Sequence, residues 1–214
     1  MTTLIEKEML EVESYLKEMV THVFEMHESA KKAMDTNDAT MAVKIIKRDE
    51  LVNNLDEMIN EQSLALLATQ APVAKDLRTT IATIRMATDL ERIGDYAKVI
   101  AEFIIIGRPV YGPFKFHIDK MYDVFMGMLK ESTSLFFSPD LKKVYEIVAR
   151  DQLIDAELKK AFNAIKSALA GTEDPTDVLN SFNIMRTLER AGDHSKNICE
   201  ASIFKVKGKK IDLG

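Results

Sequence analysis

The stretch LERIGDYAKVI, residues 90–100, decides the fold because it returns as LERAGDHSKNI at residues 188–198, with seven of eleven positions identical. A second match lies one predicted helix earlier, where RDELVNN from Arg48 parallels RDQLIDA from Arg150. The distance between the two matches is a few residues shorter in the second half, so the deletion lies in the turn between them. These paired matches indicate duplication of a three-helix unit.

The hydrophobic pattern predicts helices throughout. Apolar residues recur in steps of three and four, and no segment shows the period-two alternation of a strand. The five prolines lie at breaks between these segments, where they interrupt no helical hydrogen bonds. We predict an all-α fold whose six helices cover about residues 3–34, 37–69, 72–107, 115–137, 139–170 and 175–207.

Short polar residues and prolines mark the expected helix starts. Asn37 or Asp38 is the predicted N-cap of the second helix, and Pro72 is expected in the first turn of the third. Ser138 and Asp174, each followed by proline, are the predicted N-caps of the last two helices. The repeat then divides the chain into units at residues 1–108 and 114–207, with a short tail at 208–214.

The composition and charge of the chain argue against several classes of function. The formal charge of −5 comes from 34 acidic and 29 basic residues that are well mixed, which leaves no basic face for nucleic acid. The N-terminal residues lack the pattern of a signal peptide, and no apolar run is long enough to cross a bilayer. The single cysteine, Cys199, fits a reducing cytoplasm. We expect a cytoplasmic protein.

Each repeat carries two carboxylates four residues apart. Glu91 and Asp95, like Glu189 and Asp193, stack on one helix face. Like charges at that spacing repel each other, which invites a compensating cation. Because 29% of the chain is charged, the pairs could also belong to solvated helix faces, and the spacing leaves both interpretations open.

The middle helices carry further oxygen ligands at the same spacing. They are Asp49 and Asn53 in the first half, and Asp151 and Asp155 in the second. If the middle and last helices are antiparallel neighbours, each half could gather three or four oxygen ligands. Such a shell, poor in histidine, suits iron, Mn²⁺ or Mg²⁺ better than structural zinc. Asn53 is the weakest of these ligands, so the two sites could differ.

Two glycines and two arginines accompany the acidic pairs. Gly94 and Gly192 lie inside predicted helices, where close helix packing would explain a residue that weakens the helix. Arg92 and Arg190 lie about 100° around the helix from the adjacent glutamates. We therefore expect the arginines to pair with other helices rather than with the carboxylates.

The chain resembles the PhoU family over almost its whole length. The LERIGD and LERAGD segments carry the resemblance, together with QAPVAKDLR at 70–78 and NICE at 197–200. It implies two related three-helix bundles side by side, with metal ions or multinuclear clusters on the acidic helices. Carried over by position, the metal-binding residues would be Glu91, Asp95, Glu189 and Asp193, with Asp49, Asp151 and Asp155 added.

The same resemblance implies a regulator without catalytic turnover. Its members relay phosphate sufficiency from the Pst phosphate transporter, through its ATPase subunit, to a PhoR-type sensor histidine kinase, as negative regulators. We expect these two partners and a homodimer, with membrane contact only through the partners.

Two alternatives from other classes remain. A carboxylate-bridged di-metal enzyme would typically need Glu-x-x-His on two helices, and no histidine here lies three residues after a glutamate. A structural helical adaptor without metal would leave the acidic pairs solvated. Metal content therefore separates this last alternative from the metal-binding regulator.

Overall fold

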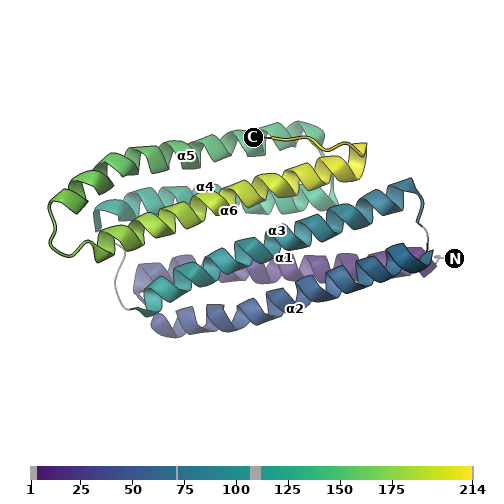
Figure 1. The fold of residues 1–214 in the computed structure, drawn as a ribbon, viewed down its shortest axis with the longest axis horizontal. Coiled ribbons are helices and arrows are strands. Elements are labelled where there is room, and N and C mark those ends of the chain that lie inside the picture. The colour runs from purple at the N-terminus through teal and green to yellow at the C-terminus, as the bar shows by residue number, and fades with distance from the viewer. Residues whose placement is uncertain (1–3, 71, 107–111, 214) are drawn as a thin grey trace.

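The computed structural model describes residues 4–70, 72–106 and 112–213, and all of its regular structure is helical. Figure 1 shows the helices as long, nearly aligned rods. The six described helices are α1 Leu4–Thr36, α2 Ala39–Gln70, α3 Ala74–Ile105, α4 Gly112–Phe137, α5 Leu141–Ala170 and α6 Thr176–Lys207. The all-α prediction is confirmed, although the predicted ends at residues 3 and 107 lie outside the described residues.

One predicted helix start is confirmed, and another is off by one residue. Asp38 precedes α2 and accepts a hydrogen bond from the backbone N–H of Met41 at 3.0 Å, which satisfies one of the free amides of the first turn. At α6 the N-cap is Pro175 and not the predicted Asp174, although the Asp174 carboxylate accepts from the backbone N–H of Thr176 at 3.0 Å.

Two other predicted starts are wrong by about two residues. The N-cap of α5 is Asp140, whose carboxylate accepts from the Lys142 amide at 3.0 Å, so Ser138 lies outside the helix. A carboxylate also interacts with the helix dipole, which favours Asp140 over the serine. Pro72 precedes α3, whose N-cap is Val73 in an extended conformation.

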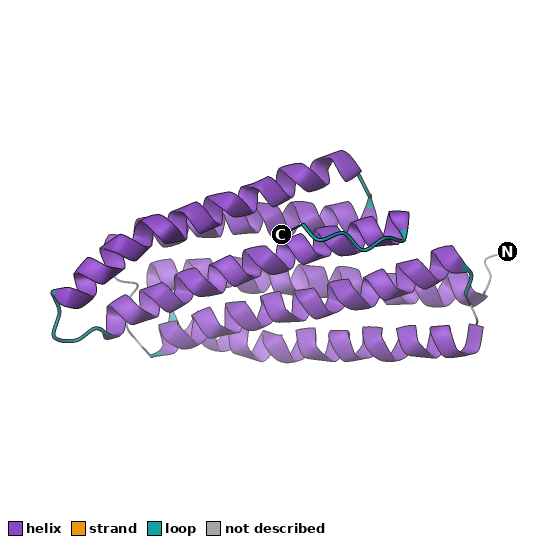
Figure 2. Ribbon diagram, turned by 45° about the horizontal axis from the view of Figure 1, so that its top comes forward, coloured by secondary structure: helices purple, strands orange, loops and turns teal. Residues whose placement is uncertain are grey.

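The helices form two bundles that lie side by side. Helices α1, α2 and α3 pack against one another, as do α4, α5 and α6, so the middle and last helices of each repeat are neighbours, which is the condition for gathering their acidic residues. Between the bundles, α3 packs against α6 and α1 against α4. Figures 1 and 2 show α3 and α6 running side by side along the length of the molecule. The buried apolar residues of both bundles belong to one continuous core.

A buried histidine connects the bundles at this junction. His27 of α1 is fully buried, and its Nε2 lies 2.8 Å from the carbonyl oxygen of Ile93 in α3. Because a carbonyl only accepts, Nε2 carries the proton. The Tyr122 hydroxyl of α4 lies 3.0 Å from both His27 Nδ1 and the His27 carbonyl oxygen. These bonds link three helices from both halves.

The segment after α6 turns back onto the bundle, as Figure 2 shows. Gly208 adopts a left-handed conformation, with φ of 68°, and ends α6. Ile211 and Leu213 are half-buried against the core, and the Leu213 amide donates to Glu200 at 2.9 Å. In the described part of the chain, no helix combines the length and apolar content of a membrane span.

Candidate functional site: two acidic clusters with internal basic residues

The first acidic cluster lies between α2 and α3, where buried Asp49 forms an ion pair with Lys98. The Lys98 Nζ lies 2.6 Å from Asp49 Oδ2, and Asp49 is only 2% exposed. Burial raises the pKa of Glu91, and the carboxylates of Asp95, Asp56 and Asp49 raise it further. The cluster thus comprises Asp49, Asp56, Glu91 and Asp95.

Two further side chains, Asn53 and Arg92, contact the carboxylates of this cluster. The Asn53 amide donates weakly to Asp49 Oδ2, at 3.4 Å. Arg92 contacts its own helix, with nitrogens 3.5 Å from Glu91 and 3.4 Å from Asp95. The expectation that Arg92 avoids these carboxylates was wrong, because its long side chain reaches around the helix surface. Arg190 instead stacks on Tyr96 of α3, as expected for contact with another helix.

The second acidic cluster repeats the plan between α5 and α6. Lys196 Nζ lies 2.5 Å from Asp151 Oδ2 and 2.9 Å from Asp193 Oδ1, so it joins the two helices. Asp151 is 5% exposed, and burial raises its pKa even though Lys196 opposes the change. Burial also raises the pKa of Glu189, with contributions from Asp193, Asp155 and Asp151. The cluster comprises Asp151, Asp155, Glu189 and Asp193.

Both helical glycines lie at these helix contacts, which confirms the packing explanation. A Cβ on Gly192 would lie 2.9 Å from Asp151 Oδ1 and 3.0 Å from Ile154 Cδ1. A Cβ on Gly94 would lie 3.3 Å from Val52 Cγ1. Gly192 therefore lets the Asp151 carboxylate lie directly against α6.

Four residues of the clusters were missed from the sequence, and one of them is Arg186, which lies three residues before Glu189 and pairs with it. Lys98 and Lys196 occupy matching positions in the repeat, three residues after Asp95 and Asp193. Their repetition was a usable signal, because residues three apart on a helix are neighbours. Asp56 was also missed, although it lies seven residues after Asp49 and therefore on the same face of α2.

The clusters combine incomplete hydrogen bonding with excess negative charge. Among the described residues, no group of three or more His, Cys, Asp or Glu side chains is arranged to hold a metal ion. Four buried carboxylate oxygens nevertheless have no hydrogen-bond partner in this part of the chain: Asp49 Oδ1, Asp56 Oδ1, Asp151 Oδ1 and Glu189 Oε2.

Each cluster holds four carboxylates and two basic side chains, which leaves two uncompensated negative charges when all are ionised. The basic pair is Lys98 and Arg92 in the first cluster, and Lys196 and Arg186 in the second. Oxygen ligands with this excess charge fit a hard divalent cation. Metal binding by the seven predicted residues stays a prediction.

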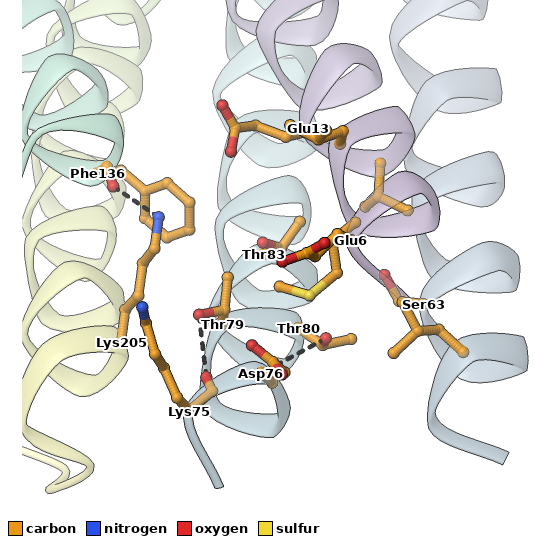
Figure 3. Close-up of a pocket in the computed structure, with 14 residues that line it drawn as sticks. Glu6, Glu13, Ser63, Lys75, Asp76, Thr79, Thr80, Thr83, Phe136 and Lys205 are labelled. Atoms are coloured by element: carbon orange, nitrogen blue, oxygen red, sulfur yellow. Dashed lines mark hydrogen bonds between the residues drawn. The ribbon is translucent and has the colours of Figure 1, made fainter. Parts of the chain in front are cut away.

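A cavity of about 730 Å³ lies apart from both clusters, beside the start of α1 and α3 and the end of α2. Figure 3 shows Lys75 and Lys205 on one side of it, with Glu6 and Glu13 coming from α1. Ser63, which is fully buried and whose hydroxyl has no partner among the described residues, also lines it. None of the predicted metal-binding residues contributes to this cavity.

Together, the duplicated bundles and their acidic clusters define a class of helical-repeat proteins with paired carboxylate sites. The PhoU domain matches the chain twice, at residues 16–104 and 118–202. The chain therefore belongs to the PhoU family.

Similar proteins and structures cover nearly the whole chain. A phosphate-specific transport system accessory protein PhoU homolog from Clostridium acetobutylicum is 32% identical over 94% of this chain and 96% of its own length. The crystal structure of PhoU from Pseudomonas aeruginosa, 30% identical, superimposes with a TM-score of 0.87 over 95% of this chain and 99% of its own. The crystal structure of the phosphate transport system regulatory protein PhoU from Streptococcus pneumoniae is 25% identical. It superimposes with a TM-score of 0.89 over 97% of this chain and 99% of its own.

Proposed function

We propose that this protein is a negative regulator of phosphate uptake and of the phosphate-starvation response. In this proposal it acts in the cytoplasm, without catalytic turnover, as an adaptor between the ATPase subunit of the phosphate transporter and a PhoR-type histidine kinase. The observation that carries the proposal is the full-length match to accessory proteins of phosphate transport, in sequence and in fold. Three of the four histidines are engaged away from the acidic clusters, which favours the regulator over a di-metal enzyme.

A gene deletion tests this role. In a strain that lacks the gene, we expect phosphate-starvation genes to be expressed constitutively at high phosphate. Normal repression in that strain would contradict the proposed regulator. A pull-down with the tagged protein should recover the transporter ATPase and the kinase, and recovery of neither would exclude the adaptor.

We propose in addition that the acidic clusters bind divalent metal, with iron, Mn²⁺ and Mg²⁺ as the candidates. Asp49, Glu91 and Asp95 would hold it in the first half, and Asp151, Asp155, Glu189 and Asp193 in the second. A bound cation would offset the excess charge and connect the middle helix of each repeat to the last. Metal analysis of the protein with Glu189 and Asp193 both changed to alanine should show less bound metal, and unchanged content would argue against the second site.

A homodimer is the third part of the proposal. Val43, Leu51 and Met58 of α2 are each more than a third exposed and lie on one side of that helix, which offers an apolar surface for a second copy. Sedimentation equilibrium should then give twice the mass of the chain. A single-chain mass at micromolar concentration would contradict the dimer.

A further inference from the structure

In each acidic cluster a lysine ammonium contacts a buried aspartate, and in the second cluster it lies between two carboxylates. We infer that Lys196 is an internal counter-ion that a divalent metal must displace, so that metal loading and the Lys196 ion pairs exclude each other. Lys98 has the same role, more weakly, in the first cluster. This inference rests on the proposed metal binding and specifies how that site is regulated.

The geometry at Lys196 supports direct competition. Its ammonium lies within 3 Å of one carboxylate from α5 and one from α6, Asp151 and Asp193. A metal bound by the same two carboxylates, even through their other oxygens, would lie within a few ångströms of the ammonium, and repulsion between the two cations would displace the lysine. The ammonium therefore bridges the helices only while the metal is absent.

The other oxygen of Asp151 shows why the lysine does not complete the site. Asp151 Oδ1 is buried and has no hydrogen-bond partner among the described residues, and it lies against Gly192. The Oε2 of Glu189 is unpartnered in the same way. A buried carboxylate oxygen without a partner is unfavourable. A cation with several coordination positions can satisfy oxygens that one ammonium cannot.

The first cluster holds its lysine less firmly. Within the described part of the chain, Lys98 forms an ion pair with Asp49 alone, and its side chain is 33% exposed, whereas the Lys196 side chain is 12% exposed. An ion pair in contact with water is weaker than an enclosed one. Metal should displace Lys98 more easily than Lys196, so removal of Lys98 should change metal affinity less.

The experiment compares Mn²⁺ binding by the full chain and by Lys196→Met, with calorimetry after treatment with chelator. We expect the variant to bind Mn²⁺ about tenfold more tightly, which corresponds to the loss of about 1.4 kcal/mol of competing interaction. Its melting temperature in chelator should fall, because Asp151 loses its counter-ion, and should rise more than that of the wild type when Mn²⁺ is added. A lysine with a purely structural role would not raise metal affinity when removed.

Controls separate competition from a general change in charge. Lys166→Met removes an exposed lysine of α5 that is eleven residues from Asp155, and it should leave Mn²⁺ affinity within about twofold of the wild type, since distant exposed charges are screened. Lys98→Met should raise affinity less than Lys196→Met. If Lys196→Met fails to fold, Lys196→Gln serves instead, because its amide can still donate to Asp151.

The possible outcomes separate failure of the counter-ion role from failure of the metal-binding proposal on which it rests. Equal or weaker Mn²⁺ binding by the Lys196 variant overturns the counter-ion role and leaves the metal proposal standing. Binding of Mn²⁺ by neither the wild type nor the variants overturns the metal proposal, and this inference with it. Equal gains in affinity from Lys166→Met and Lys196→Met would show a general electrostatic effect and would also overturn the counter-ion role.

Discussion

Gly192 is the residue on which the packing of the second acidic cluster most depends. It allows the buried Asp151 carboxylate to lie against α6 through one oxygen while Lys196 contacts the other. A single side-chain carbon at this position would overlap both Asp151 and Ile154. The side chains of Asp151 and Ile154 therefore occupy the space that a side chain at residue 192 would need.

Gly192→Ala should lower the free energy of unfolding by about 1 kcal/mol. Overpacking at a tight contact costs about 1–3 kcal/mol, which exceeds the gain of about 1 kcal/mol from alanine in a helix. Urea denaturation measures the change. Gly171→Ala is the matched control, because its new Cβ would meet only ordinary contacts, 3.7 Å or more away, and its stability should be unchanged or slightly higher. Equal effects at the two glycines would contradict the tight packing.

His27 makes stability depend on pH. Burial lowers the pKa of His27 from 6.5 to about 4, so between these values the unfolded chain binds more protons than the folded one. Its contribution is present in full above pH 6.5 and is lost as the pH falls towards 4. At about 1.4 kcal/mol per pKa unit, the loss approaches about 3 kcal/mol.

His27→Gln should remove this pH dependence. Glutamine can still donate to the Ile93 carbonyl but does not titrate. The difference in unfolding free energy between wild type and variant, measured in urea from pH 7 to 4, should change steadily in favour of the variant. A difference that stays constant over this range would contradict a neutral buried histidine.

At the scale of helices, the N-terminus of α5 shows what a capping residue requires. Serine followed by proline at 138 and 139 has the features of a helix start, yet Asp140 is the residue that caps the helix. A cap requires a particular backbone geometry as well as a suitable side chain, and Asp140 has the extended conformation with φ of −127°.

Asp140→Ala should therefore destabilise the protein by about 1 kcal/mol, because the Lys142 amide loses its acceptor. Thermal unfolding followed by circular dichroism measures the change. Ser138→Ala is the control and should leave the melting temperature unchanged, since Ser138 is exposed and outside the helix. The reverse result would place the cap at the serine.

At the scale of the molecule, the two repeats share one core rather than forming independent units. The contacts of α3 with α6 and of α1 with α4 join the bundles, and His27 and Tyr122 bond across the junction. The Asp89 carboxylate of α3 adds to this interface by binding His194 Nδ1 at 2.8 Å and the Asn197 amide at 3.0 Å, both from α6.

Calorimetry of the whole chain should consequently show a single unfolding transition. Loss of either bundle would expose the apolar surface of the other, so partly unfolded chains should be rare. The calorimetric enthalpy should equal the van't Hoff enthalpy. Two resolved transitions, or a calorimetric enthalpy well above the van't Hoff value, would show that the halves unfold separately.

The sequence by itself determined the helical class, the duplication and the face on which each acidic pair lies. The repeat of residues 90–100 and the hydrophobic periodicity are local features, and local geometry fixes which residues share a helix face. The sequence left open whether the middle and last helices are neighbours, and the structure shows that they are. The predicted metal-binding residues could be named on this basis, but their charge state could not.

Only the tertiary structure decided which cations face the carboxylates. The positions of α5 and α6 in the sequence do not specify how the two helices are rotated about their axes when they pack. The sequence therefore could not show that Lys196 reaches Asp151 on the neighbouring helix. The same holds for Lys98 and Asp49, and for the burial that raises the pKa of Glu91 and Glu189. Desolvation and ion pairing depend on what lies across a helix contact, and packing of the whole chain sets that contact.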